Sequence, residues 1–311
     1  MTDSNSSEPS TDRWSNRSGI SIDRRNVLQG IGAFGLGTGV LGSVQAKEND
    51  GGPSRSGPAA TDVPVSAQFW SFTEADLSVA ELIHECADAG YDAVEPHTLD
   101  DEDAIATALE EADVRMGSAH VDIDEIEADP EGVVETYSQF GEPALIEPYI
   151  DGETWSTEAS VVEFAERVNG VADEVADLGL EFGYHNHDHE FEQLEDGDEI
   201  AFDVFAEHIE DHVHLQIDVG WVATGGENPI EYITNYADNV RSIHMKNMKD
   251  GEFVEIDEGE VNMKAVANVA RAAADVDYLI YEYDQAPEPL ESMAYGAEFL
   301  DRWSGPRGRG K

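Results

Sequence analysis

The sequence predicts an α/β fold of the (β/α)8 TIM-barrel class, and three observations support this prediction. Between Val65 and Trp303, eight short apolar runs alternate with longer segments of helical periodicity. The stretch is close in length to the roughly 250 residues of a typical barrel. Seven of the apolar runs end in an acid or a histidine: Glu95, His120, Glu147, His185, Asp218, His244 and Glu282. A barrel gathers the carboxyl ends of its strands on one face, where the active sites of this fold lie.

A doubly wound open sheet uses the same alternation of strand and helix and is the alternative fold. It would spread the seven strand ends along a line too long for one site, whereas a barrel arranges them around one axis. The positions of the polar residues therefore favour the barrel.

The first 46 residues have the features of a targeting segment. Arg24 and Arg25 follow a polar, Ser-rich stretch and precede an uncharged, Gly-rich run that ends in small residues at Ala46. This pattern resembles a twin-arginine export signal, which predicts an exported protein with no stable membrane association after signal removal. A retained membrane anchor is the alternative, because the run reaches the length of about 20 residues that can span a bilayer.

The rest of the chain is expected to form a linker, one barrel domain and a tail. Residues 47–62 have no apolar period and are rich in Gly, Pro and Ser, which is typical of a flexible linker. The barrel domain is expected over residues 63–303, followed by a disordered Gly/Arg tail over 304–311.

Within the barrel domain, eight strands are expected in order along the chain. Their ranges are Val65–Trp70, Tyr91–Glu95, Val114–His120, Ala144–Tyr149, Leu180–His185, Val213–Asp218, Val240–His244 and Tyr278–Glu282. One intervening helix should begin after the capping residue Ser78 and stop at Gly90. Another is expected from about Glu158 to Leu178, and the last from about Leu290 to Trp303.

The composition limits the possible partners. Asp plus Glu number 68 against 17 Lys plus Arg, which gives a formal net charge of −51, while 40% of the residues are hydrophobic. A folded protein with a carboxylate-rich surface adapted to high salt is the simplest interpretation. A nucleic acid is not an expected partner, because its binding needs a basic surface. The single cysteine, Cys86, excludes an internal disulfide within the chain.

Acids and histidines at the ends of the last four strands predict a metal site. His185, Asp218, His244 and Glu282 offer two imidazoles and two carboxylates. Such a mixed set suits Mn²⁺, Co²⁺, Zn²⁺ or Fe²⁺ better than Ca²⁺, which prefers oxygen ligands alone. We therefore expect these four residues to bind one divalent metal and to leave positions open for two substrate oxygens.

The segments around these four residues resemble the sugar phosphate isomerase/epimerase family, the xylose isomerase-like barrels that include endonuclease IV and inosose dehydratase. The resemblance extends over about residues 65–303. It implies that Asp218, His244 and Glu282 hold one metal, and that a sugar chelates this metal through a carbonyl and the neighbouring hydroxyl. The chain departs from the family on the fifth strand, where His185 stands in place of a Glu that usually serves as both ligand and proton shuttle.

The reaction that the resemblance implies needs a carboxylate as proton carrier. A metal that polarises a carbonyl makes the adjacent C–H bond acidic and stabilises the resulting enediolate. A carboxylate must then remove and return the proton, and Glu282, Glu190 and Glu147 are the candidates. For Glu147, an ordinary place on the acidic surface is the alternative.

Five further residues are expected to contact the substrate. Lys246 would supply a positive charge beside it, His187 and His120 would bind hydroxyl groups, Trp221 would offer an apolar face to a sugar ring, and Glu95 ends the second strand at the same face. The alternatives are a solvated loop for His187, a hydrogen-bond partner of a metal ligand for His120, and a surface position for Glu95.

The leading functional hypothesis is a divalent-metal-dependent sugar isomerase or epimerase that acts through an enediolate on a small sugar or keto-sugar. A keto-sugar lyase or dehydratase would use the same proton abstraction and stays open. A third hypothesis is an exported sugar-binding protein that has lost catalysis, which the replacement of Glu by His185 suggests. A phosphodiesterase resembling endonuclease IV is disfavoured, because the chain lacks the basic groove that DNA requires. The sequence predicts no particular oligomeric state.

Overall fold

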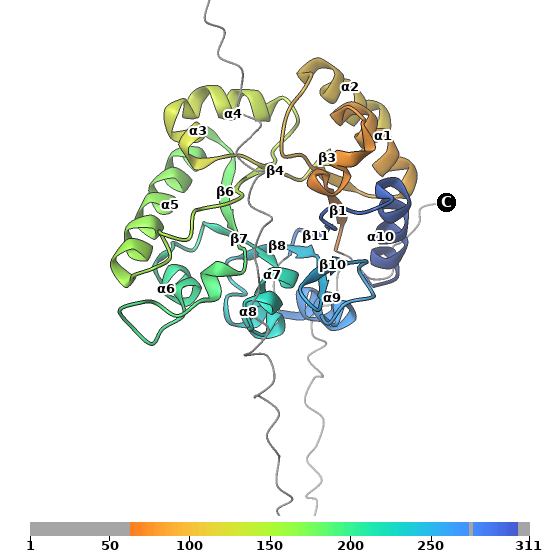
Figure 1. Cartoon of the computed structure of the whole chain (residues 1–311). Helices are drawn as coiled ribbons and strands as arrows, with labels where there is room; N and C mark the ends of the chain where they lie inside the picture. The colour runs from red at the N-terminus through yellow and green to blue at the C-terminus, as the bar shows by residue number, and fades with distance from the viewer. Residues whose placement is uncertain (1–62, 274–275, 304–311) are drawn as a thin grey trace, which may run out of the picture. The chain divides into compact units, whose positions relative to one another are not determined.

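A computed structural model of the chain describes residues 63–273 and 276–303 (Figure 1). The predicted signal segment 1–46, the linker 47–62 and the tail 304–311 lie outside the described residues. No helix in the described ranges combines the length and the apolar character that crossing a membrane requires.

The described part contains one nine-stranded parallel sheet. In chain order its strands are β1 Val65–Gln68, β2 Ala93–Glu95, β3 Arg115–Met116, β4 Ser118–His120, β5 Ala144–Glu147, β6 Glu181–His185, β7 His214–Asp218, β8 Val240–Met245 and β11 Tyr278–Tyr281. Their spatial order is β3-β2-β1-β11-β8-β7-β6-β5-β4. The two outermost strands, β3 and β4, are consecutive in the chain and are separated only by Gly117, so the sheet curves into a nearly closed barrel.

Gly117 completes this ring on both sides. Its N–H donates to the carbonyl of Val94 in β2 at 3.0 Å, and its carbonyl accepts from the N–H of Ala144 at 3.2 Å. A Cβ at this position would lie 2.8 Å from the ring of Tyr278, so a larger residue here would force that ring to move. The barrel prediction is therefore confirmed and the open doubly wound sheet is wrong, since an open sheet keeps its edge strands far apart.

Helices cover the outside of the ring of strands (Figure 1). They are α1 Val79–Ala89, α2 Glu102–Ala112, α3 Ile123–Ala128, α4 Pro130–Ser138, α5 Glu158–Leu178, α6 Ala201–His208, α7 Val219–Thr224, α8 Pro229–Asn235, α9 Met263–Ala273 and α10 Pro289–Trp303. The expected caps are present on α1: Ser78 and Glu81 form a capping box, and Gly90 adopts φ 101° at the end. The predicted helix Glu158–Leu178 has the predicted bounds.

Three expectations about the strands need correction. The run Val65–Trp70 leaves the strand after Gln68 and continues as a 3₁₀ helix, Phe69–Ala75, because the Gln68 side chain accepts a hydrogen bond from Trp70 N at 3.0 Å. The run Val114–His120 forms two short strands around Gly117. An antiparallel hairpin of β9 Asn247–Lys249 and β10 Glu252–Val254 was not expected.

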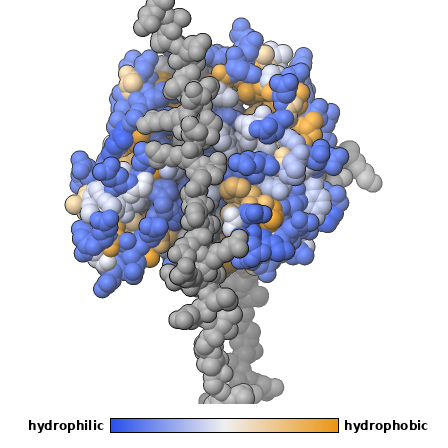
Figure 2. Space-filling model, in the orientation of Figure 1, coloured by the Kyte–Doolittle hydropathy of each residue, from blue (hydrophilic) through white to orange (hydrophobic). Residues whose placement is uncertain are grey.

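The two faces of the sheet carry different side chains. In β6, Tyr184 faces the helices and its ring contacts those of Trp155, Phe164 and Phe205 at centroid distances of 5.1 to 5.6 Å. His185, the next residue, points into the barrel, where its ring lies 4.5 Å from that of His244. This alternation along the strand places apolar packing outside and polar groups at the barrel interior. On the face shown in Figure 2, most of the described surface is hydrophilic and apolar residues form small separate patches.

Candidate metal centre

Four buried side chains from the late strands meet at the carboxyl end of the barrel. His185 ends β6, Asp218 ends β7, His244 lies near the end of β8, and Glu282 follows β11. The parallel register sets Asp218 beside His244 directly. Donor atoms of all four residues lie within 4.8 Å of one another, and the side chains are between 0 and 5% exposed. This group can hold a metal ion.

The hydrogen bonds of Asp218 leave one of its oxygens available for a ligand. Oδ1 accepts from the backbone N–H groups of Gly220 at 2.8 Å and Trp221 at 3.0 Å, which fixes the carboxylate at the start of α7. Oδ2 receives no aligned hydrogen bond from any residue in the described part of the chain. A buried carboxylate oxygen without such a bond is costly unless a cation lies close to it, and in this structure the ammonium nitrogen of Lys246 lies 3.2 Å from Oδ2.

His185 presents a nitrogen to the same position. Its Nδ1 lies 3.0 Å from Oε1 of Gln216, an amide oxygen that can only accept, so Nδ1 carries the proton. Nε2 then has the lone pair and lies 4.0 Å from Oδ2 of Asp218. A nitrogen lone pair and a carboxylate oxygen at this separation leave room for a metal at the usual bond lengths of about 2.0–2.2 Å. The residues present therefore fit a metal ion.

His244 lies between two carboxylates. Its Nδ1 is 2.6 Å from Oε2 of Glu282, and its Nε2 is 2.8 Å from Oε1 of Glu95. Burial alone would lower the pKa of His244, but the charges of Glu95 and Glu282 outweigh it and raise the pKa to about 10. Glu95 holds the ring through Nε2, as carboxylates orient metal-binding histidines in other proteins, so a metal at Nδ1 would have to replace the proton that Glu282 now accepts.

Glu95 is a fully buried centre of hydrogen bonds rather than a surface acid. Oε1 accepts from Gln68 Nε2 at 2.6 Å as well as from His244, and Oε2 accepts from Gln216 Nε2 at 2.6 Å and from the hydroxyl of Ser118. The alternative of a surface position is wrong, since the residue is 0% exposed. Its oxygens accept hydrogen bonds from the protein's own side chains.

His120 belongs to the same group of hydrogen bonds. Its Nε2 lies 3.0 Å from Oε1 of Gln216 and 3.2 Å from Oε1 of Glu95, and its ring stacks on that of His244 with centroids 5.7 Å apart. Burial would raise the pKa of Glu95, but the neighbouring His120 and His244 hold it well below its usual value. Through Gln216 and Glu95, His120 contacts the partners of two predicted ligands.

Lys246 places a buried ammonium group against the predicted ligands. Its Nζ lies 3.2 Å from Oδ2 of Asp218, 3.2 Å from Oε2 of Glu282 and 3.1 Å from Oδ2 of Asp284, and the side chain is 1% exposed. Burial disfavours the charged form, but the three carboxylates raise the pKa of Lys246 above its ordinary value. The side chain is therefore a permanent cation in the site.

The four predicted ligands lie in a region of the chain that matches a known protein family. A family model described as xylose isomerase-like TIM barrel matches residues 83–303. The chain belongs to the xylose isomerase-like TIM barrel family. The match spans every strand from β2 onward and includes all four predicted metal ligands.

Solved structures share the fold at low sequence identity. A sugar phosphate isomerase/epimerase from Parabacteroides distasonis ATCC 8503 is 19% identical with a TM-score of 0.67, over 78% of this chain and 98% of its own. A xylose isomerase-like TIM barrel protein from Mycobacterium smegmatis, solved in complex with magnesium, is 15% identical with a TM-score of 0.58, over 79% of this chain and 98% of its own.

One curated relative is similar in sequence over part of the chain. It is the inosose dehydratase of Clostridium botulinum (strain Alaska E43 / Type E3), which is 22% identical over 175 residues. The match covers 49% of this chain and 58% of the relative, so it spans little more than half of that protein.

In this member of the xylose isomerase-like family, the carboxylates of the two other acid–base candidates accept hydrogen bonds from protein groups outside the four-residue metal group. Glu147 is 1% exposed, which rules out a surface position, and its oxygens accept from the backbone N–H groups of Ile123 at 2.5 Å and Tyr149 at 2.9 Å. Burial raises its pKa to about 8. Glu190 accepts from the hydroxyl of Tyr184 at 2.6 Å and from the N–H of His187 at 2.9 Å. Glu282 is thus the one of the three candidates that belongs to the four-residue group.

His187 and Trp221 lie beside the centre with unused polar atoms. The ring of His187 is 5.1 Å from that of His185 and 5.4 Å from that of Trp221, and the residue is half-buried rather than freely solvated. Within the described ranges, His187 Nδ1, Trp221 Nε1 and Asp284 Oδ1 are buried atoms without a hydrogen-bond partner. Buried polar atoms are normally paired, so these three atoms are free to bind a polar ligand or water.

Sequence reasoning missed several supporting residues. Gln216 stands two positions before Asp218 on the same strand, so the period of two could have placed both on the interior face. Asn186 binds the backbone of Asp218 twice, accepting from its N–H at 3.0 Å and donating to its carbonyl at 3.3 Å. Asp284 carried a weaker signal, as one acid among 68.

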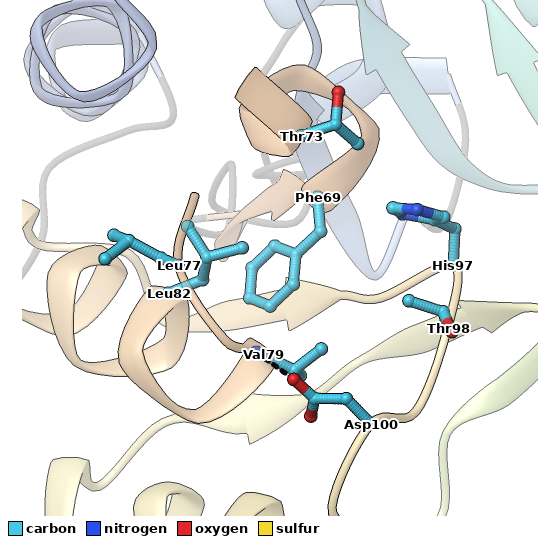
Figure 3. Close-up of a pocket in the computed structure, with 8 residues that line it drawn as sticks. All are labelled: Phe69, Thr73, Leu77, Val79, Leu82, His97, Thr98 and Asp100. Atoms are coloured by element: carbon cyan, nitrogen blue, oxygen red, sulfur yellow. Dashed lines mark hydrogen bonds between the residues drawn. The ribbon is translucent and has the colours of Figure 1, made fainter. Parts of the chain in front are cut away.

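A small cavity lies between the first 3₁₀ helix, α1 and the loop after β2 (Figure 3). Its volume is about 160 Å³, and it is lined by Phe69, Thr73, Leu77, Val79, Leu82, His97, Thr98 and Asp100. Asp100 accepts from the N–H of Val79 at 3.1 Å and fixes the start of α1. The cavity is mainly apolar, in contrast to the charged centre.

Proposed function

We propose that the protein is a divalent-metal-dependent sugar isomerase or epimerase whose reaction passes through an enediolate. The observation that carries this proposal is the buried donor set of His185, Asp218, His244 and Glu282 in a chain of the xylose isomerase-like family. Mn²⁺, Co²⁺, Zn²⁺ and Fe²⁺ match two imidazoles and two carboxylates. When bound, the metal would polarise a substrate carbonyl and make the neighbouring C–H bond acidic.

The chain's own residues would bind and orient the sugar around this centre. Trp221 Nε1 and His187 Nδ1, which no other described group engages, can bond hydroxyl groups of a polyol. Lys246 supplies a positive charge near the position where negative charge develops. Glu282, held as a carboxylate by His244 and Lys246, would accept the proton and return it.

A keto-sugar lyase or dehydratase is the second candidate, because the curated relative is an inosose dehydratase. Both reactions begin with the same proton abstraction and differ in whether a neighbouring substituent is then expelled. The same residues would serve either reaction, so the outcome depends on whether the substrate carries a leaving group next to the carbon that loses the proton.

The test uses metal-free and Mn²⁺-loaded protein with a panel of free ketoses and 3-keto-glucosides in D₂O, followed by NMR. Metal-dependent exchange of a ring proton without bond cleavage supports the isomerase, and release of water or an aglycone supports the lyase. Glu282→Gln should abolish either reaction, whereas Glu298→Gln, an exposed change on α10, should not. Sugar binding without turnover, unchanged in EDTA, would contradict both and favour a binding protein.

We also propose that the chain is exported through the twin-arginine segment at its start. Arg24 and Arg25 with the uncharged run to Ala46 support this proposal. Fractionation of cells that express the full chain should find the barrel outside the cytoplasm, and Arg24→Lys with Arg25→Lys should retain it inside. Equal distribution of both versions would contradict export by this route.

A further inference from the structure

Lys246 contacts the same carboxylate oxygens that a metal would use. Oδ2 of Asp218 and Oε2 of Glu282 each lie 3.2 Å from its ammonium nitrogen. The other oxygen of Asp218 is already occupied by two backbone N–H groups, so Oδ2 is the one left for an ion. A dication on these oxygens would lie close to the ammonium, and like charges a few ångströms apart in a buried site repel strongly, so the two cations compete for the carboxylates.

A second position for the ammonium is present beside the first. Asp284 already contacts Nζ through Oδ2 at 3.1 Å, and its carboxyl also lies against that of Glu282, while its buried Oδ1 receives no hydrogen bond from an N–H or O–H group of the described residues. The rings of Trp221 and Phe253 lie 4.9 and 5.3 Å from Nζ and offer aromatic faces to a cation. The ammonium can therefore leave Asp218 and Glu282 while it keeps Asp284.

We propose that Lys246 is an internal competitor of the metal: its ammonium neutralises Asp218 and Glu282 when the site holds no metal, and it moves onto Asp284 when a metal binds. Lys246 would then stabilise the metal-free protein and lower its metal affinity. Asp284 is a positioning residue in this scheme, because it holds the displaced ammonium. The inference rests on the proposed metal centre and adds a two-position cation to it.

The test measures Mn²⁺ affinity by calorimetry on the full chain, with circular dichroism to verify folding. In Lys246→Met the carboxylates have no internal cation, so Mn²⁺ should bind about tenfold or more tightly. The gain in affinity should equal the factor by which the ammonium reduces the fraction of native protein whose site is free for a metal. Its metal-free form should melt at a lower temperature than the native protein. Lys249→Met, an exposed change on the adjacent β9 with the same loss of charge, should alter neither quantity.

A double-mutant cycle separates displacement from a general effect of charge. Asp284→Asn removes the second position, so it should weaken Mn²⁺ binding when Lys246 is present and weaken it much less in the Lys246→Met background. Additive effects of the two changes, or an affinity that Lys246→Met leaves unchanged or lowers, would overturn the competition while the metal centre stands. If neither the native protein nor Lys246→Met binds Mn²⁺, the metal centre itself is wrong and the competition with it. If the variants that carry Lys246→Met do not fold, the single variant Asp284→Asn still tests the second position. Weaker Mn²⁺ binding than in the native protein supports that position, and unchanged binding contradicts it.

Discussion

Two pairs of buried carboxylates in this barrel have the same chemistry and different surroundings. Asp218 and Glu282 meet imidazole and ammonium nitrogens at the late strands, and Asp218 keeps one oxygen without an aligned hydrogen bond from the described residues. Glu147 and Glu190 are equally buried, yet protein N–H and O–H groups engage both oxygens of each. Burial of an acid therefore does not identify a catalytic group. The hydrogen-bond partners of each oxygen make the distinction. A carboxylate with an oxygen that no N–H or O–H group engages can bind a ligand, whereas one with both oxygens engaged stabilises the fold.

The largest expected effect is at Asp218. In Asp218→Asn the amide oxygen can still accept from the N–H groups that Oδ1 now binds, but an amide nitrogen replaces Oδ2 and cannot bind a cation. We expect loss of Mn²⁺ binding and a fall in kcat/KM of about 10³ or more, with the fold retained. Calorimetry and steady-state kinetics measure the two losses. Native-like metal affinity would place the metal elsewhere and remove the contrast between the two pairs.

Glu147 should show the opposite behaviour. Glu147→Ala leaves the buried N–H groups of Ile123 and Tyr149 without their acceptor, which should lower the free energy of unfolding by about 2 kcal/mol or more. Metal affinity should stay within about twofold of the native value at a temperature where the variant is folded, an expectation that follows from the independence of separate sites. Urea unfolding and calorimetry test these outcomes. A large loss of metal affinity in a folded variant would mean that Glu147 serves the centre after all.

Asn186 lies between the two cases, because it contacts a ligand only through the backbone. Removing its two hydrogen bonds to the peptide of Asp218 in Asn186→Ala should weaken Mn²⁺ binding about tenfold, the lower end of what supporting residues of metal ligands contribute. The kcat of the metal-saturated enzyme should change less than the affinity. If kcat falls while the affinity holds, Asn186 acts on the substrate instead.

The smallest effect concerns pH and lies outside the metal centre. Burial alone would lower the pKa of His189, but Asp188, Glu190 and the carbonyl of Ile150 outweigh it and raise the pKa to about 9. The charged form is therefore favoured in the folded state, and its contribution is complete below pH 6.5 and lost as the pH rises towards 9. We expect part of the free energy of unfolding to be lost in this range. The loss should be absent in His189→Gln, and an identical pH profile for both proteins would contradict it.

The sequence predicted the barrel because its apolar runs and helical periods are long and regular. It did not predict the division of the third run into two strands at Gly117, since the ring that lies against Gly117 belongs to Tyr278, on a strand far away in the sequence. The β9–β10 hairpin did have a local signal. Asp250 and Gly251 both adopt positive φ, 53° and 81°, as expected for an Asp-Gly pair that links two antiparallel strands.

The part of the candidate site that could be predicted is the part formed by residues at the ends of parallel strands. Acids and histidines that end apolar strands, such as Asp218 and His244, face the same rim because the strands are parallel. Glu190 follows its strand in a short 3₁₀ turn, where no period indicates direction, and only the structure shows that it faces the hydroxyl of Tyr184. Likewise, the contacts of Lys246 with three carboxylates depend on distances that no spacing encodes.

The most direct test is anomalous diffraction at the manganese edge from crystals of the native protein grown with Mn²⁺. We expect one strong peak at the carboxyl end of the barrel, about 2.0–2.3 Å from donor atoms of His185, Asp218, His244 and Glu282. A map with no peak among these four side chains, from crystals that hold manganese elsewhere or none at all, would contradict it.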